Sequence, residues 1–235
     1  MRCLSPFFLV VFLFFVAGWA RADGVVRIVD EDSGVDPAEH PALIAQAERE
    51  YAKLKRLFGA DVGVVTIRLR PKGVARHLPP ADIVIPAKQV RRAVVITAHE
   101  ITHLLTQGWA NGLLKEGLAV YAQDRVGEQS GWPNYGRLNH AVALEAITKS
   151  TPLVRGPYDA NGVLSTRNPG KTALRRASYA VAGSWVTWLI DVKFGGDVGR
   201  FMEKLYRSGN YQNALGEPFK PLRRQWRQYL ERFKE

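Results

Sequence analysis

Apolar and polar positions follow the period of strands and helices in the first third of the chain. The β-branched runs at 25–29 (VVRIV) and 62–69 (VGVVTIRL) predict two strands. Between them, residues 37–58 carry apolar side chains at helical spacing, and Gly59 follows where that helix is expected to end. This alternation predicts a sheet with a helix packed against it.

A third short apolar run and a polar segment complete the predicted sheet region. Residues 82–85 (DIVI) end at Pro86, which cannot donate a backbone hydrogen bond, and this predicts a strand at the sheet edge. The preceding residues 71–80 contain three prolines and predict a loop. An extended peptide could add to such an edge by strand pairing.

From residue 88 onward the apolar positions keep only the helical period. Residues 151–172 are rich in Pro, Gly, Asn and Arg and predict a long surface loop, and no internal repeat or low-complexity linker is present. The order of elements predicts an α+β fold: a small N-terminal mixed sheet with an edge strand (residues 23–108), then a helical C-terminal lobe (residues 109–235). The predicted helices cover 88–107, 113–125, 138–148, 173–194, 198–207 and 221–233.

The first 22 residues have the order of a secretory signal peptide. Arg2 precedes an almost unbroken apolar run at 6–16, and Ala20 and Ala22 supply small residues before a cleavage point. The run is shorter than the roughly 20 residues that a membrane-spanning helix needs. We therefore expect an exported chain, periplasmic or secreted, that begins at Asp23.

Composition narrows the chemistry and the partners. The only cysteine, Cys3, lies within the predicted signal, so disulfides, thiolate ligands and a cysteine nucleophile are not expected. The net charge of +11 favours contact with an anionic envelope surface or an acidic substrate. Export argues against a nucleic-acid partner, and the sequence does not determine an oligomeric state.

The segment from His99 to His103 (HEITH) is the strongest chemical signal. Two histidines four residues apart on a helix share one face and can bind one zinc ion, with Glu100 close to a zinc-bound water. Glu116 is the best third ligand, because a turn at 108–112 lets the next helix fold back toward the metal. The competing ligands are His77, Asp124, Glu128 and His140.

HEITH followed by LLKEGLAVY resembles the gluzincin zinc metallopeptidases, in particular the bacterial peptidase MA-like group. The segment at 178–185 (SYAVAGSW) is similar to a tyrosine-containing helix of that group, and the resemblance extends over about residues 83–230. It implies a zincin-like fold with an active-site helix, His99, His103 and Glu116 as zinc ligands, and Glu100 as general base. The Gly-x-Met-Glu-Asn segment of the large aminopeptidases is missing, so capture of a peptide amine is not implied.

The expected reaction is hydrolysis of a peptide or protein substrate. Zinc lowers the pKa of its bound water and polarises the substrate carbonyl, and Glu100 accepts the water proton and passes it to the leaving amine. Tyr179 is the candidate donor to the oxyanion or, alternatively, a core aromatic residue; Tyr121 and Tyr158 are weaker choices. Val120 stands where some gluzincins keep an acid that braces a zinc histidine, so that support must come from elsewhere.

Two other function classes remain open from the sequence. The same fold could serve as a non-catalytic binding scaffold in the envelope, although a scaffold has no need of Glu100. A zinc amidase acting on a cell-wall linkage would use the same residues. The loop from Arg155 to Arg176, which precedes Tyr179, could border the cleft and select acidic substrates. Its cations are Arg155, Arg167, Lys171, Arg175 and Arg176.

Overall fold

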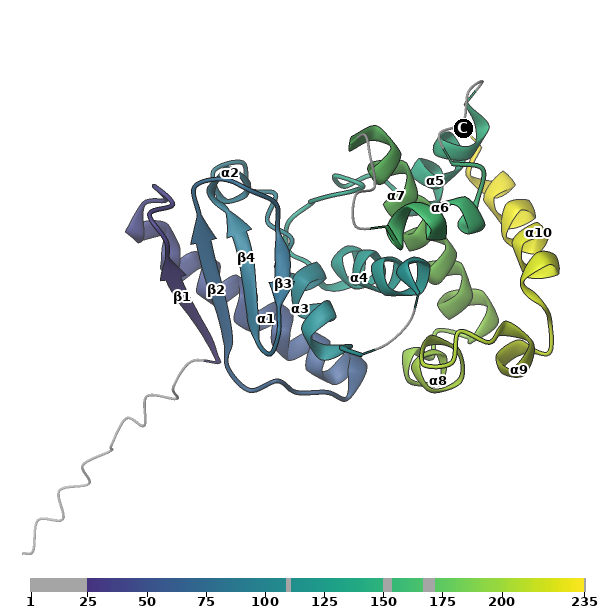
Figure 1. Ribbon diagram of the computed structural model, residues 1–235, viewed down its shortest axis with the longest axis horizontal. Helices are drawn as coiled ribbons and strands as arrows, with labels where there is room; N and C mark the ends of the chain where they lie inside the picture. Colours follow the sequence, from purple (N-terminus) through teal and green to yellow (C-terminus); the bar gives the residue numbers. More distant parts are fainter. Residues whose placement is uncertain (1–24, 109–110, 150–153, 167–171, 235) are drawn as a thin grey trace, which may run out of the picture.

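The structure is a computed structural model that describes residues 25–108, 111–149, 154–166 and 172–234. A small sheet with helices on one face forms the N-terminal part, and helices alone form the rest (Figure 1). The predicted α+β class is confirmed. The predicted signal peptide, residues 1–22, lies outside the described residues.

The sheet is mixed and has the strand order β1-β2-β4-β3. β1 pairs in parallel with β2, β2 pairs in parallel with β4, and β3 runs antiparallel to β4. The two strands predicted from β-branched runs are β1 and β2, shifted by one to three residues. The strands are β1 (Val26–Asp30), β2 (Val65–Arg70), β3 (Arg76–Leu78) and β4 (Asp82–Pro86).

The prediction that residues 82–85 form the edge strand is wrong. β4 lies between β2 and β3, and the two edge strands are β1 and β3, of which β3 falls within the predicted loop. Pro86 is compatible with an inner strand because β3 pairs only with residues 82–84, so the missing N–H lies beyond that ladder. Strand addition by a peptide is therefore possible at β3 and not at β4.

The helices follow the predicted order with three corrections, one of which is the short helix α9 (Tyr211–Leu215), in a stretch where no helix was predicted. The predicted helix 88–107 is broken into α2 and α3 by a turn in which Ala93 has a left-handed φ of 50°. The predicted loop 151–172 contains α6. The helices are α1 (His40–Phe58), α2 (Ala87–Val90), α3 (Thr97–Leu105), α4 (Gly112–Val126), α5 (Asn139–Thr148), α6 (Pro157–Leu164), α7 (Thr172–Trp188), α8 (Val198–Phe201), α9 (Tyr211–Leu215) and α10 (Phe219–Leu230).

Shorter helical turns extend several of these elements. Two π-helical segments continue α7 and α8, and two 3-10 turns precede α1 and follow α10. These segments are η1 (Pro37–Glu39), η2 (Leu189–Lys193), η3 (Met202–Tyr206) and η4 (Glu231–Phe233). Together α7 and η2 span the long helix predicted at 173–194.

Two hydrophobic clusters build the core. The first joins the sheet to α1 and α3, and the predicted apolar face of α1 supplies its fully buried Tyr51 and Leu54. The second fills the helical lobe around Trp185, Trp188 and Trp226, with aromatic rings of Trp185 and Trp226 5.9 Å apart. The apolar stripe of α10 is part of this second core, because its Leu222, Trp226 and Leu230 are fully buried.

α4 and α7 pack unusually closely, and glycines at the crossing permit it. A Cβ added at Gly117 would lie 2.5 Å from Val186 Cγ2 and 2.9 Å from the carbonyl carbon of Ala182. On the other helix, a Cβ at Gly183 would lie 2.8 Å from Asn139 Nδ2 and would also overlap the side chain of Val120. Small residues at both positions therefore let the helix that carries Glu116 approach α7.

Within the described ranges, no helix has both the length and the apolar character that crossing a membrane requires.

Candidate metal centre

Two helices bring the three predicted metal ligands together. α3 carries His99 and His103 one turn apart, and α4 carries Glu116. Asn111 begins α4 as a capping residue, since its side chain accepts a hydrogen bond of 3.0 Å from the backbone N–H of Leu114. The cap fixes where the second helix starts, and the return of α4 beside α3 places its first turn next to the histidines.

The ligand atoms have the spacing that one small cation requires. The Nε2 atoms of His99 and His103 are 3.3 Å apart, and Glu116 Oε2 lies 3.5 Å from the first and 3.1 Å from the second. Tetrahedral bonds of about 2.0–2.1 Å to a zinc ion would separate the ligand atoms by about 3.3 Å. These three buried groups could hold a metal ion.

The charges at the centre favour an ionised carboxylate facing two imidazoles. Burial alone raises the pKa of Glu116, but the charge of His103 and hydrogen bonds from both histidines outweigh burial and hold this pKa well below its usual value. Burial lowers the pKa of His99, and the neighbouring Glu116 and Glu100 more than reverse that effect. An anionic carboxylate beside two imidazole nitrogens is a donor set that a divalent cation binds.

Glu100 lies beside this cluster and is also buried, with 4% of its surface exposed. Burial raises the pKa of its carboxyl group, against the opposing charges of His99 and His103 and a backbone hydrogen bond from His77. The charge of a bound dication would oppose the rise as well. Glu100 also lines the cavity described below, so its carboxylate faces space that a substrate could enter.

His77 is a further histidine at the centre, contributed by the edge strand β3. Its Nδ1 atom is 3.9 Å from Glu100 Oε2, and its ring centroid is 4.6 Å from that of His103. Burial and the charges of His103 and Lys115 lower the pKa of His77 to about 4, so its imidazole is neutral near pH 7. His77, Glu100 and His103 form a second group that could hold a metal ion. The two groups share His103, so one ion would bind to one group or to the other.

The two donor sets differ in geometry. The contact between His77 and Glu100 is 3.9 Å, which is longer than the 3.1–3.5 Å that separates the atoms of the first set. Glu100 would also be lost as a proton acceptor if it bound the metal. The set of His99, His103 and Glu116 therefore fits one cation better. The sequence had indicated His77 only as a competing ligand, because Glu116 has the shorter route back to the two histidines.

A cavity of about 460 Å³ opens directly onto His99 and Glu100. Tyr179 stands in its wall, outside both hydrophobic clusters, and its ring stacks on His99 at a centroid distance of 5.9 Å. Burial and the nearby charge of Glu116 raise the pKa of Tyr179, so the phenol remains protonated and can donate a hydrogen bond. Of the two weaker tyrosines, Tyr121 lines a different cavity and Tyr158 is 72% exposed.

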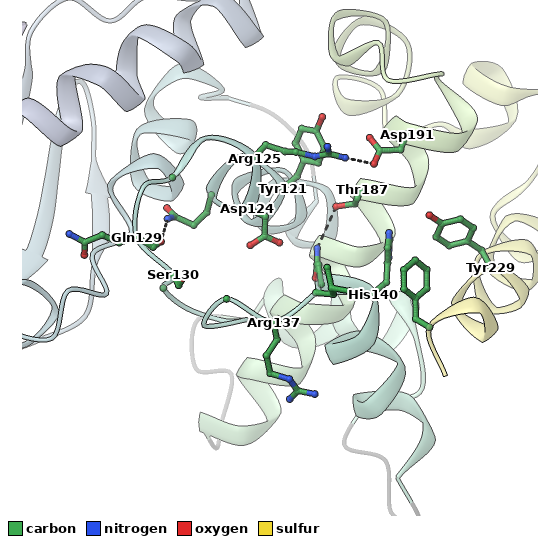
Figure 2. Close-up of a pocket in the computed structure, with 17 residues that line it drawn as sticks. Tyr121, Asp124, Arg125, Gln129, Ser130, Arg137, His140, Thr187, Asp191 and Tyr229 are labelled. Carbon is green, nitrogen blue, oxygen red and sulfur yellow. Dashed lines mark hydrogen bonds and ion pairs between the residues drawn. The ribbon is translucent and has the colours of Figure 1, made fainter. Parts of the chain in front are cut away.

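The other competing ligands lie away from the centre. Asp124 and His140 point into a second cavity of about 550 Å³ (Figure 2). Glu128 is paired with Arg49 at 2.7 Å. His140 Nδ1 lies 2.8 Å from the hydroxyl of Ser184, which also accepts a hydrogen bond of 3.1 Å from the Trp226 indole.

This second cavity is lined by both signs of charge. Burial raises the pKa of Asp124 to about 6, and the Asp124 carboxylate accepts a hydrogen bond of 3.0 Å from Asn134. The Nδ1 atoms of His99 and His103 have no hydrogen-bond partner among the described protein groups. Asp124 therefore affects His99 through its charge and does not hold the imidazole by a hydrogen bond.

Comparison with protein-family models, with curated proteins and with solved structures gives no match. The functional argument consequently rests on the chemistry and geometry of the site itself.

Proposed function

We propose that the chain is a zinc-dependent peptidase of the gluzincin type with a zincin-like fold. In this proposal His99, His103 and Glu116 bind zinc, and Glu100 is the general base. The observation that carries the proposal is the spacing of 3.1–3.5 Å among two imidazole nitrogens and one carboxylate oxygen. Three protein ligands leave a fourth position for water or substrate, which is typical of catalytic zinc.

When bound at such a site, zinc lowers the pKa of a water ligand to about 7 and polarises a carbonyl group. Glu100, one residue after the first histidine, is placed to accept a proton and return it to the leaving amine. Tyr179, with its protonated phenol in the cavity wall, is placed to donate to the developing oxyanion. These roles make the site hydrolytic.

Two observations favour a peptidase over the alternatives. Burying a carboxylate is costly, and a scaffold would gain nothing from the buried Glu100 in the lining of a cavity. The edge strand β3 lies beside α3 and is paired on one side only, so an extended peptide can add to its free side next to Glu100. A compact cell-wall linkage would not need such an edge.

Metal analysis and one substitution test the proposal. The purified mature chain is expected to bind one zinc ion per molecule and to cleave peptides in a library digest. Glu100→Gln should keep the zinc and lower turnover by about a hundredfold to ten-thousandfold, because a positioned base contributes that much. Glu203→Gln, a change of the same type at an exposed position on η3, is the matched control.

The third ligand has its own test. Glu116→Ala should lower the zinc content, because it removes one of three ligands while leaving the histidines in place. Unchanged zinc stoichiometry in this variant, or undiminished turnover in Glu100→Gln, would refute the assignment.

We also infer that the protein is exported and acts in the periplasm or outside the cell. The inference rests on the order of charged, apolar and small residues at 1–22. N-terminal sequencing of the mature protein should begin at Asp23, and a mature protein that retained the first 22 residues would contradict cleavage.

A further inference from the structure

The cavity that opens onto the candidate centre carries a strong excess of positive charge. Lys88, Arg92 and Arg175 contribute to its lining, whereas Glu100 is the one acidic residue among the described residues that line it. Lys88 and Arg92 are exposed and come from α2 and the turn after it, and Arg175 comes from α7. Cations from two separate elements therefore face one space.

None of these three cations forms an ion pair with a residue that the structure describes. Some arginines elsewhere are paired, for example Arg49 with Glu128 at 2.7 Å, whereas others, such as the exposed Arg224, form no ion pair with a described residue either. Arg175 differs because its Nε atom is buried and has no hydrogen-bond acceptor in the described structure, although its side chain also hydrogen-bonds Tyr179. An unsatisfied buried donor of a charged group is costly, and a carboxylate entering the cavity would satisfy it.

The position of Arg175 links this charge to the chemistry. Its guanidinium lies 5.9 Å from the ring centroid of Tyr179, which in turn stacks on His99. A group bound by Arg175 would therefore sit within a side chain's length of the candidate metal ligands. Trp132 and Tyr135 supply aromatic surface in the same cavity, against which the aliphatic part of a peptide can pack.

The cavity is also continuous with the edge strand. Gly73, Val74 and Ala75, which lead directly into β3, form part of its wall. A peptide paired with β3 would consequently pass the cations before or after it reaches Glu100.

We propose that the site selects peptides that place a carboxylate in this cavity next to the bond to be cleaved. The proposal rests on the proposed function, because it names the substrate class of the same site. The carboxylate is that of a Glu or Asp side chain or of the peptide C-terminus, since both present the same planar anion to an arginine.

Isothermal titration with short peptides tests the inference. The protein is the zinc-loaded mature chain with Glu100→Gln, which binds without turnover. In one series of C-terminally amidated peptides, Glu replaces Gln at one position at a time. A second series compares the same peptide with a free C-terminus and with an amidated C-terminus. We expect one position, or the free terminus, to improve affinity by about tenfold at low ionic strength.

Substitutions then test which cations cause the preference for acidic peptides. Arg175→Gln and the double variant Lys88→Gln with Arg92→Gln should each reduce the acidic-to-neutral affinity ratio by about threefold or more. Lys88 and Arg92 are exposed, so their replacement spares the fold even if Arg175→Gln disturbs it. Arg224→Gln removes one exposed charge from α10, outside the cavity lining, and should leave the ratio unchanged.

The outcomes separate this inference from the proposed function. Affinity ratios within about twofold for every peptide, or a ratio that the cavity variants do not reduce, would overturn the inference. Cleavage of neutral and acidic peptides at equal rates by the unmodified protein would do the same while leaving the peptidase proposal intact. Binding of acidic peptides without any cleavage by that protein would leave the inference standing and refute the proposed function.

Discussion

The close crossing of α4 and α7 makes Gly117 a sensitive position. Replacing it with Ala adds a Cβ that would lie 2.5 Å from Val186 Cγ2, whereas ordinary contact begins at 3.4 Å. The helices would have to separate by about 0.9 Å, the difference between these distances, or Val186 would have to change rotamer. The backbone of Ala182 is equally close and cannot rotate away.

Two opposing free energies set the size of the effect. Ala is favoured over Gly inside a helix by about 1 kcal/mol. Overpacking against backbone costs about 3 kcal/mol, the upper part of the usual range. Gly117→Ala should therefore lower the free energy of unfolding by about 2 kcal/mol. Gly162→Ala is the matched control, because an added Cβ in α6 meets no atom within 4 Å and the helix gain of about 1 kcal/mol remains.

Thermal unfolding followed by circular dichroism measures the difference. A gap of about 3 kcal/mol between the two variants corresponds to about 6–12 °C in Tm for a chain of this size. Zinc content provides a second readout, since Glu116 adjoins Gly117 and moves with α4. A Gly117→Ala protein with a Tm at or above that of the unmodified chain would refute the packing argument.

Two further predictions concern histidines. His77→Ala should retain one zinc per chain in metal analysis, because His99, His103 and Glu116 form a complete set; loss of zinc would instead assign the metal to His77, Glu100 and His103. Burial lowers the pKa of His140 to about 4, so the unfolded chain takes up its proton near pH 6.5 before the folded chain does. The contribution of the buried neutral His140 to the free energy of unfolding is therefore complete above about pH 6.5, and it falls by about 3 kcal/mol as the pH drops to 4. His140→Gln should flatten the pH dependence of urea unfolding over this window, and an unchanged slope would contradict it.

Much of the fold follows from local patterns. β-branched runs predicted β1 and β2, and helical spacing predicted α1, α4, α5 and α7 within a few residues. The prediction of one long helix at 88–107 was wrong because the apolar spacing continues across a turn in which Ala93 has a left-handed φ. α6 was missed because it contains residues typical of loops, such as Asn161 and Gly162. Tertiary contacts support the helix, among them the hydrogen bond that Asn161 accepts from the backbone N–H of Leu113.

Local sequence patterns also predicted which residues of the candidate centre lie close together. Spacing on one helix determines that His99 and His103 share a face, and the glycine-containing turn before α4 allows Glu116 to return to them. No helical spacing relates these residues to His77, which reaches Glu100 only because β3 pairs with β4 beside α3. Strand order is a long-range property, and a proline-rich segment of this length carries no local sign of it.

By itself, then, the sequence determined the α+β class, the shared helix face of His99 and His103 beside Glu100, and a following helix that could bring the Glu116 carboxylate to them. Only the tertiary structure decided that β3 and not β4 is the sheet edge, that Gly117 and Gly183 lie at a helix crossing, and that Lys88, Arg92 and Arg175 surround one cavity. The spacing of apolar residues in the sequence indicates which face of a helix or strand is buried. Which elements meet, and which charges are left facing each other without partners, depends on packing between residues far apart in the chain.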